Sequence, residues 1–126
     1  METIFIDTHI VVWLFVKDKE KFTPQTIELI ENSELTISPM VIIELGLLYE
    51  IKRLNYSPQH IIENLKETIS LSISDISFER IALKSTELLW TRDPFDRIIT
   101  ATAMVENTRL LTKDQMILEH YENAVW

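Results

Sequence analysis

The sequence predicts an α/β fold of one domain, in which helices cover both faces of a parallel sheet. Short apolar runs of β-favouring residues alternate with helix-length segments, and this alternation indicates crossover connections between parallel strands. The length of 126 residues, 46% of them apolar, suits one domain with a real core. Every proline follows a helix-capping residue, in the pairs Thr23-Pro24, Ser38-Pro39, Ser57-Pro58 and Asp93-Pro94.

The first half of the chain is expected to hold two strands and four helices. Residues 3–6 form a buried strand because apolar, β-favouring residues run straight into Asp7. The segment 8–16 is apolar nearly all round and is expected to form a buried helix, followed by a charged turn at 17–21. The other elements are a helix at 24–31 with Ile27 and Ile30 on one face, a strand at 34–37, a helix from 39 to about 53, and a helix at 58–69.

The second half is expected to hold three strands and three helices. Residues 71–76 alternate between apolar and polar, as a strand at the edge of a sheet does. Ser77 is expected to cap a helix that runs to about residue 90. The remaining elements are a helix at 94–105, a strand at 109–112, a short helix from 115 to about 121, and a last strand at 124–126.

Composition excludes several kinds of site. The chain has no cysteine, which removes disulfides and zinc–thiolate sites, and one glycine, which removes glycine-rich phosphate loops. The net charge of −8 argues against a general electrostatic grip on nucleic acid, but not against a nuclease whose carboxylates hold cations. The longest apolar run, 10–16, is too short to cross a bilayer, so we expect a cytoplasmic protein without membrane contact.

Four carboxylates are expected to meet at one edge of the sheet. They are Asp7 after the first strand, Glu44 in the third helix, Asp96 in the first turn of the sixth helix, and Asp114 after the strand at 109–112. Residues just past the ends of parallel strands converge on one edge, and a charge in an apolar run like that around Glu44 is costly unless paired or bound to metal. Carboxylates without His or Cys ligands favour Mg²⁺ or Mn²⁺, which can activate water and clamp a phosphate.

Each of these residues also has a purely structural interpretation. Asp7 and Asp114 could cap the helices that follow them, and capping is the favoured role of Asp93. Asp96 could complement a helix dipole. Glu44 could be neutralised by a cation, for which the candidates are Lys52, Arg53 and Arg97.

Several other residues are interpreted as structural. His9 is expected to pack or hydrogen-bond rather than to bind metal. Gly46 costs a helix about 1 kcal/mol relative to Ala, which suggests close helix packing, within the chain or across a dimer interface. The tryptophans are expected in the core or at its rim, at positions Trp13, Trp90 and Trp126.

The order and setting of the acids resemble those of PIN-domain ribonucleases, and more narrowly of VapC-type toxins of toxin–antitoxin pairs. The most specific similarity is the block Asp93-Pro94-Phe95-Asp96-Arg97 followed by the strand end Leu111-Thr112-Lys113-Asp114. The resemblance covers essentially the whole chain, through the segments 5–9, 38–44, 92–103 and 110–114 and the terminal Trp126. One departure is Thr91, where the family often has His.

The resemblance implies a five-stranded parallel sheet, with Asp7, Glu44 and Asp96 as the main Mg²⁺ or Mn²⁺ ligands and Asp114 in support. It also implies an RNA substrate, a cognate antitoxin and a homodimer. The further residues assigned to the site are Thr8 and Thr112 as nearby hydroxyls, Asp93 as cap or site residue, and Arg92, Arg97 and Lys113 as phosphate contacts.

The first functional hypothesis is therefore a metal-dependent endoribonuclease. A structure-specific DNA nuclease is an alternative, although the chain lacks the length and the basic arch needed to thread a strand. A catalytically silent binding module is the non-enzyme alternative, and it predicts missing acids, whereas all four are present.

Overall fold

The computed structural model describes residues 1–126 and contains a five-stranded, all-parallel sheet in the order β3-β2-β1-β4-β5. The strands are β1 (Glu2–Ile6), β2 (Ser33–Ile37), β3 (Ser72–Ile73), β4 (Leu110–Leu111) and β5 (Ala124–Val125). In the register, Phe5 of the central strand lies opposite Thr36 on one side and Leu110 on the other. The predicted fold class and the predicted edge position of β3 are confirmed.

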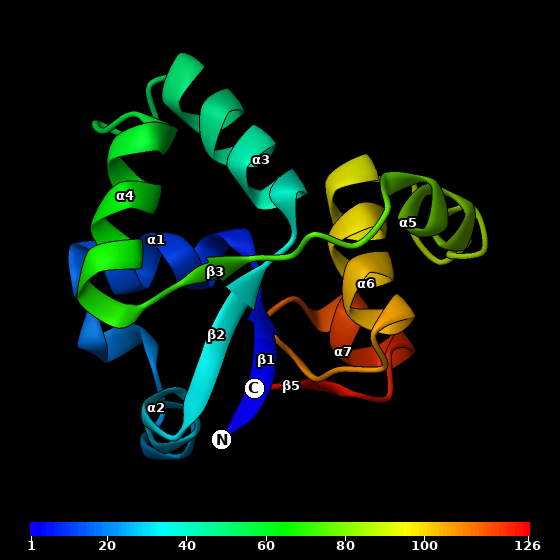
Figure 1. Ribbon diagram of the computed structural model, residues 1–126, viewed down its shortest axis with the longest axis horizontal. Helices are drawn as coiled ribbons and strands as arrows, with labels where there is room; N and C mark the ends of the chain where they lie inside the picture. The colour runs from blue at the N-terminus through cyan, green and yellow to red at the C-terminus, as the bar shows by residue number, and fades with distance from the viewer.

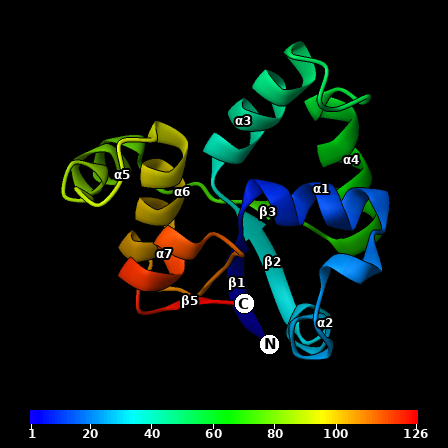
Figure 2. The ribbon, with the colours of Figure 1, turned by 180° about the vertical axis from the view of Figure 1, so that it is seen from behind.

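Seven α-helices connect and flank the strands (Figure 1). Helices α1 to α4 lie on one side of β1 and β2, and α5 to α7 on the other, in both views (Figures 1 and 2). A short 3₁₀ helix, Lys19–Lys21, lies in the charged turn after α1. The helices are α1 (Thr8–Val16), α2 (Pro24–Glu31), α3 (Pro39–Glu50), α4 (Pro58–Ile69), α5 (Phe78–Ser85), α6 (Pro94–Val105) and α7 (Gln115–His120).

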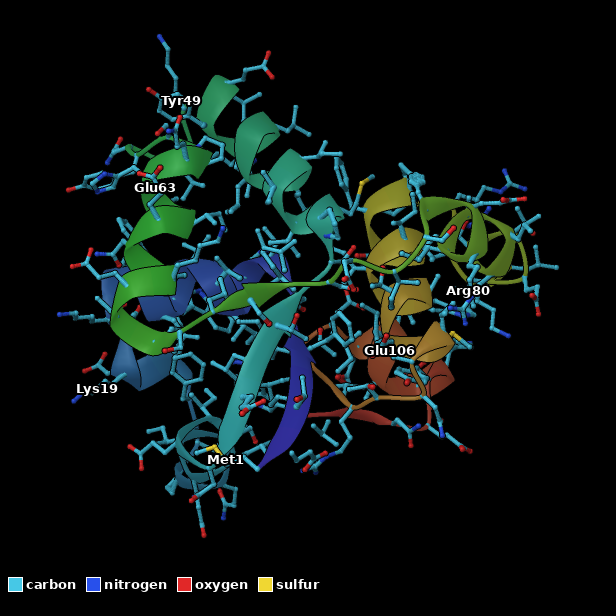
Figure 3. The ribbon with its side chains drawn as sticks, in the orientation of Figure 1. Met1, Lys19, Tyr49, Glu63, Arg80 and Glu106 are labelled. Carbon is cyan, nitrogen blue, oxygen red and sulfur yellow. The ribbon has the colours of Figure 1, made fainter.

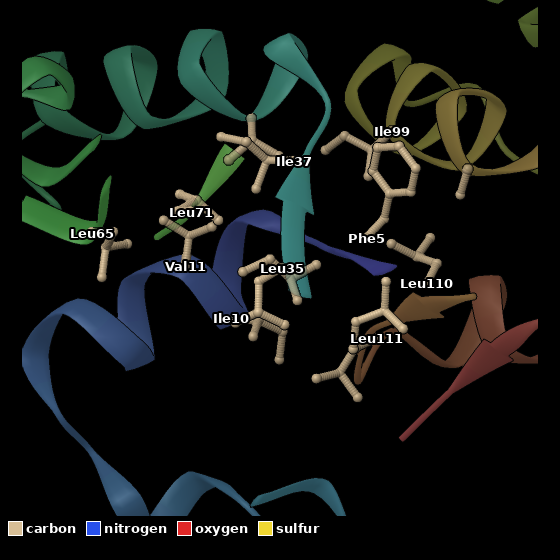
Figure 4. Packing of buried hydrophobic residues seen from close by; sticks show 14 of the residues in the cluster. Phe5, Ile10, Val11, Leu35, Ile37, Leu65, Leu71, Ile99, Leu110 and Leu111 are labelled. Carbon is tan, nitrogen blue, oxygen red and sulfur yellow. The ribbon is translucent and has the colours of Figure 1, made fainter. Parts of the chain in front are cut away.

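Both faces of the sheet are covered, as predicted. Side chains alternate between faces along a strand, yet Ile4, Phe5 and Ile6 are all at most 2% exposed. Phe5 packs towards Ile99 of α6 (Figure 4). One cluster of nineteen buried residues forms the main core, while charged residues such as Lys19, Glu63, Arg80 and Glu106 lie at the periphery (Figure 3). No helix combines the length and the apolar character needed to span a membrane.

All four proline-marked helix starts are confirmed, because Thr23, Ser38, Ser57 and Asp93 each accept a backbone N–H of their helix. Ser77 stands at the N-cap position of α5, but its hydroxyl accepts no backbone N–H of the helix. The prediction that α1 is buried is only partly right. Its buried residues are Thr8, Ile10 and Val11, and Val16 is 54% exposed.

Two helices end earlier than predicted. Helix α5 ends at Ser85 instead of near residue 90, because the hydroxyls of Ser85 and Thr86 bond the carbonyls of Ala82 and Leu83, both at 2.7 Å. Helix α3 ends at Glu50 instead of near residue 53, since Lys52 takes a left-handed conformation with φ of 65°. Strand β3 is also much shorter than the predicted 71–76.

The glycine of α3 is not required by packing within the chain. A Cβ on Gly46 would meet Pro58 at 3.8 Å, which is ordinary van der Waals contact. The predicted intramolecular reason for this glycine is therefore wrong.

Candidate active site

A cavity of ≈ 240 Å³ opens at the carboxyl end of the sheet. Four separate elements bring carboxylates to it, because the residues past β1 and β4, a residue of α3 and the first turn of α6 converge there. The predicted convergence of four carboxylates on one edge of the sheet is confirmed. The four residues are Asp7, Glu44, Asp96 and Asp114.

Asp7 combines the structural and the site interpretation. One carboxylate oxygen, Oδ1, accepts the Ile10 N–H at 3.2 Å and so caps α1, while Oδ2 accepts a short hydrogen bond from the Thr112 hydroxyl. Burial raises the pKa of Asp7, and the hydrogen bonds from Thr112 and Ile10 partly oppose the rise. The side chain is therefore held rigidly at the cavity in an environment that disfavours its charge.

Glu44 has a hydroxyl partner instead of a cation. The Thr8 hydroxyl donates to Glu44 Oε1 at 2.5 Å, and the carboxylate is partly exposed at the cavity. The salt bridges of the chain are Lys84–Glu87 and Arg109–Glu2, so the predicted alternative of a neutralising cation from Lys52, Arg53 or Arg97 is wrong.

Asp96 has a strongly raised pKa. Burial is the largest cause, the neighbouring carboxylates add to it in the order Asp93, Asp114, Glu44 and Asp7, and together they raise the pKa of Asp96 to about 7. At neutral pH about half of the Asp96 carboxyl groups carry a proton, since burial and four neighbouring acids disfavour the charged form. The cavity is therefore a place where positive charge is favoured.

The remaining two aspartates both cap helices. Asp114 Oδ1 accepts the Ile117 N–H at 3.0 Å, and the Asp114 N–H bonds the Thr112 hydroxyl at 3.0 Å. Asp93 accepts the Phe95 N–H at 2.8 Å but does not line the cavity. Asp114 thus serves both roles, and the favoured capping role of Asp93 is confirmed.

Comparison with known proteins gives the family. The PIN domain model matches residues 4–123. The chain belongs to the PIN domain family. A relative of this PIN domain is Ribonuclease VapC22 of Mycobacterium tuberculosis, 28% identical over 127 residues, which cover 95% of this chain and 93% of the relative.

Solved structures share the fold of this PIN domain. One is VapBC2 from Rickettsia felis bound to a DNA fragment from its promoter, with a TM-score of 0.69 and 20% identity over 98% of this chain and 97% of that one. Another is a toxin–antitoxin complex from Klebsiella pneumoniae, with a TM-score of 0.60 and 22% identity over 98% and 96% of the two chains.

Of the three basic residues expected near phosphate, the PIN domain brings only Lys113 to the cavity. The Arg97 Nε–H donates to the Thr91 carbonyl at 2.6 Å, which makes it a structural residue of the turn before α6. Arg92 is exposed and does not line the cavity.

Two residues at the cavity of this PIN domain were assigned only structural roles from the sequence. His9 and Trp13 both line it, beside the acids. They are four positions apart on α1, so they share a helix face directly after Asp7. This four-residue spacing after Asp7 was the feature of the sequence that could have placed both residues at the site.

The donor chemistry of the cavity fits a hard divalent ion, because four carboxylates offer oxygen ligands and a charge that a cation would offset. No three of its acidic and histidine side chains are close enough together to hold an ion in the positions seen. The fit therefore concerns the kind and number of donors, and ligation requires the side chains to draw together.

Proposed function

We propose that this PIN domain is a metal-dependent endoribonuclease that hydrolyses RNA phosphodiester bonds. The observation that carries the proposal is the set of four carboxylates, supplied by four elements, around one cavity. The relative named Ribonuclease VapC22 supports RNA as the substrate. The raised pKa of Asp96 adds support, because a cluster that disfavours its own negative charge favours a cation.

Under this proposal Mg²⁺ or Mn²⁺ is held by Asp7, Glu44, Asp96 and Asp114. The ion supplies an activated water and neutralises charge on the phosphate. Thr112 and Thr8 fix the orientations of Asp7 and Glu44 through the hydrogen bonds that they donate. Lys113, exposed at the cavity, is placed to contact a phosphate oxygen.

The test is RNA cleavage by the purified protein with Mg²⁺ or Mn²⁺, compared with a chelator. Asp7→Asn is expected to abolish cleavage while keeping the cap on α1, because the amide oxygen can still accept the Ile10 N–H. Asp75→Asn is the matched control, since Asp75 is exposed and lies outside the cavity. Cleavage that survives chelation or the Asp7 substitution would exclude the metal mechanism.

Two further arms separate the alternatives. Single-stranded and flap DNA tested beside RNA distinguishes a DNA nuclease, which would cleave DNA preferentially. Calorimetric titration with Mg²⁺ and Mn²⁺ distinguishes a silent binding module, which would give no heat at millimolar ion.

The chain is further proposed to be the toxin of a toxin–antitoxin pair, with an antitoxin protein as partner. Support comes from the solved structures that share the fold, VapBC2 of Rickettsia felis and the toxin–antitoxin complex of Klebsiella pneumoniae. Expression of the chain alone in bacteria should arrest growth, and a small reading frame just upstream should restore it. Arrest that persists in Asp96→Asn would contradict a nuclease toxin.

The lack of cysteine and an RNA substrate fit a cytoplasmic location.

The proposed homodimer is supported by an apolar stripe along α3 and the residue that follows it. Ile43, Leu47 and Ile51 follow one another every four residues and are 59%, 42% and 52% exposed. Leu47→Glu should convert a dimer to a monomer in light scattering. Leu89→Glu is the control, because Leu89 is 79% exposed and lies away from α3. A monomeric wild-type protein would contradict the proposal.

A further inference from the structure

Four aromatic rings form a continuous wall at one side of the acid cavity. The wall consists of His9, Trp13, Phe22 and Trp126. Trp13 is its centre, with ring centroids 6.1 Å from His9, 6.0 Å from Phe22 and 6.1 Å from Trp126. Phe22 and Trp126 are themselves 6.0 Å apart. The rings come from α1, the turn before α2 and the end of the chain, so the fold gathers them rather than the local sequence.

The aromatic wall is not fully buried in the core. His9 is exposed, and Trp13, Phe22 and Trp126 are partly exposed. His9 and Trp13 line the cavity that holds the four carboxylates. Trp13 and Phe22 also line a neighbouring hollow of ≈ 290 Å³. Trp13 therefore stands between the two hollows, and the wall leads from one to the other.

Lysines without ion-pair partners lie beside the aromatic wall and the neighbouring hollow. Lys113 Nζ lies 5.5 Å from the ring centroid of Trp126, and Lys21 Nζ lies 5.8 Å from that of Trp13. The neighbouring hollow is lined by Lys17 and Lys19 as well. None of these four lysines is in either salt bridge of the chain, although the net charge is −8.

We propose that the aromatic wall is a stacking subsite for a nucleobase next to the scissile phosphate of a single-stranded RNA. The RNA backbone would pass Lys113 and continue past Lys21 towards the turn at 17–21, the direction in which α1 runs from the end of β1 (Figure 2). The inference rests on the proposed ribonuclease activity and deepens it by assigning where the substrate lies.

Aromatic rings combined with basic side chains hold single strands because every base has a π-face and every nucleotide carries a phosphate. A wall of this kind tolerates sequence variation, and it offsets the repulsion between RNA and four carboxylates. RNA explains the aromatic wall better than a protein partner does, because the wall forms one side of the cavity in which the scissile phosphate of the RNA must lie.

The experiment measures the affinity for fluorescently labelled RNA oligonucleotides in chelator and at low salt, so that cleavage plays no part. One oligonucleotide is intact, and a second of the same length is abasic at the central positions. His9→Ala and Trp13→Leu remove rings, and Lys113→Ala removes charge. His120→Ala is the matched control for His9→Ala, because His120 is also exposed and stacks on a tryptophan, Trp90, at 5.1 Å, but lies outside the cavity.

Each ring substitution is expected to weaken binding of the intact RNA about tenfold and to leave binding of the abasic RNA nearly unchanged. Lys113→Ala should weaken both, whereas the exposed Lys66→Ala on α4 should weaken neither. Circular dichroism verifies the fold of Trp13→Leu, and the exposed His9 keeps the test valid if that variant unfolds.

Three outcomes would overturn the subsite. They are equal losses for intact and abasic RNA, an equal loss in His120→Ala, and no loss in either ring variant, the last of which would leave the wall to a protein partner. If the protein cleaves RNA but the ring variants bind normally, the subsite fails and the ribonuclease stands. If the ring variants lose RNA affinity but no cleavage occurs with Mg²⁺ or Mn²⁺, the activity fails and the subsite stands.

Discussion

The two ends of the central strand carry acids in opposite circumstances. At its start, Glu2 receives two hydrogen bonds from the guanidinium of Arg109, at 2.7 and 2.6 Å, and this lowers the pKa of Glu2. At its end, Asp7 accepts a hydrogen bond from the Thr112 hydroxyl, and burial raises the pKa of Asp7. Arg109 and Thr112 flank the same strand, β4.

The difference shows what each end of the sheet does. The amino end is neutralised within the chain, so its acid contributes only to the structure. The carboxyl end gathers four acids, none of them in an ion pair, which costs stability and favours the binding of positive charge. Function is expected where the fold leaves its charges uncompensated.

The largest expected effect is the response to divalent ions. If the carboxyl end binds Mg²⁺ or Mn²⁺, ion at about a hundred times its dissociation constant adds about 2.7 kcal/mol and raises the Tm by on the order of 10 °C. Glu2→Gln should keep this rise and Asp7→Asn should lose it, as measured by thermal unfolding monitored by circular dichroism. A rise of equal size in Asp7→Asn would contradict the contrast between the two ends.

The next effect concerns how Asp7 is held. Thr112→Val keeps the shape of a fully buried side chain but removes the hydroxyl that bonds Asp7 and accepts the Asp114 N–H. Cleavage is expected to fall about tenfold or more, as for other residues that orient metal ligands. Thr36→Val is the control, because the buried Thr36 hydroxyl bonds only the Ser72 carbonyl. Equal losses in both variants would reduce Thr112 to a packing role.

The sequence predicted the starts of helices better than their ends. The capped prolines marked four starts, and α2, α4 and α6 also end where their apolar pattern stops. Helices α3 and α5 end early because of a left-handed residue, Lys52, and of the hydroxyls of Ser85 and Thr86. These helix ends depend on local backbone and hydroxyl conformations that the periodicity of apolar residues does not indicate.

The sequence predicted the site through its strand ends. Acids that follow parallel strands share an edge, so the convergence of Asp7 and Asp114 follows from topology. The hydrogen bond from Thr112 to Asp7 joins residues 105 positions apart, and the family resemblance implied Thr112 only as a nearby hydroxyl, without this partner. The aromatic wall was missed because Trp126 reaches Trp13 through tertiary packing, which one helix face does not reveal.

A smaller effect is the pH dependence at the carboxyl end in the absence of metal. The pKa of Asp96 is raised to about 7 from an ordinary value of 3.8, so the folded state binds the proton more tightly than the unfolded state. Its contribution favours folding most below pH 4 and is lost as the pH rises through 7. Asp96→Asn should therefore raise the Tm at pH 8 and change it little at pH 4. A variant less stable than wild type at pH 8 in chelator would show that the Asp96 charge is already compensated.

The smallest expected effect lies at the amino end, and it has the opposite sign. The pKa of Glu2 is lowered, so its ion pair with Arg109 stabilises the fold above the ordinary value of 4.5 and is lost as the pH falls below it. Both side chains are substantially exposed, at 46% and 38%, so water and salt weaken the pair. Glu2→Gln should lower the Tm slightly at pH 7, and the difference should shrink as the pH falls below 4.5 and in 1 M salt. Thermal unfolding of Glu2→Gln, Arg109→Gln and the double variant checks this. Additive losses would mean that the two groups do not interact, and the contrast between the ends would then rest on the carboxyl end alone.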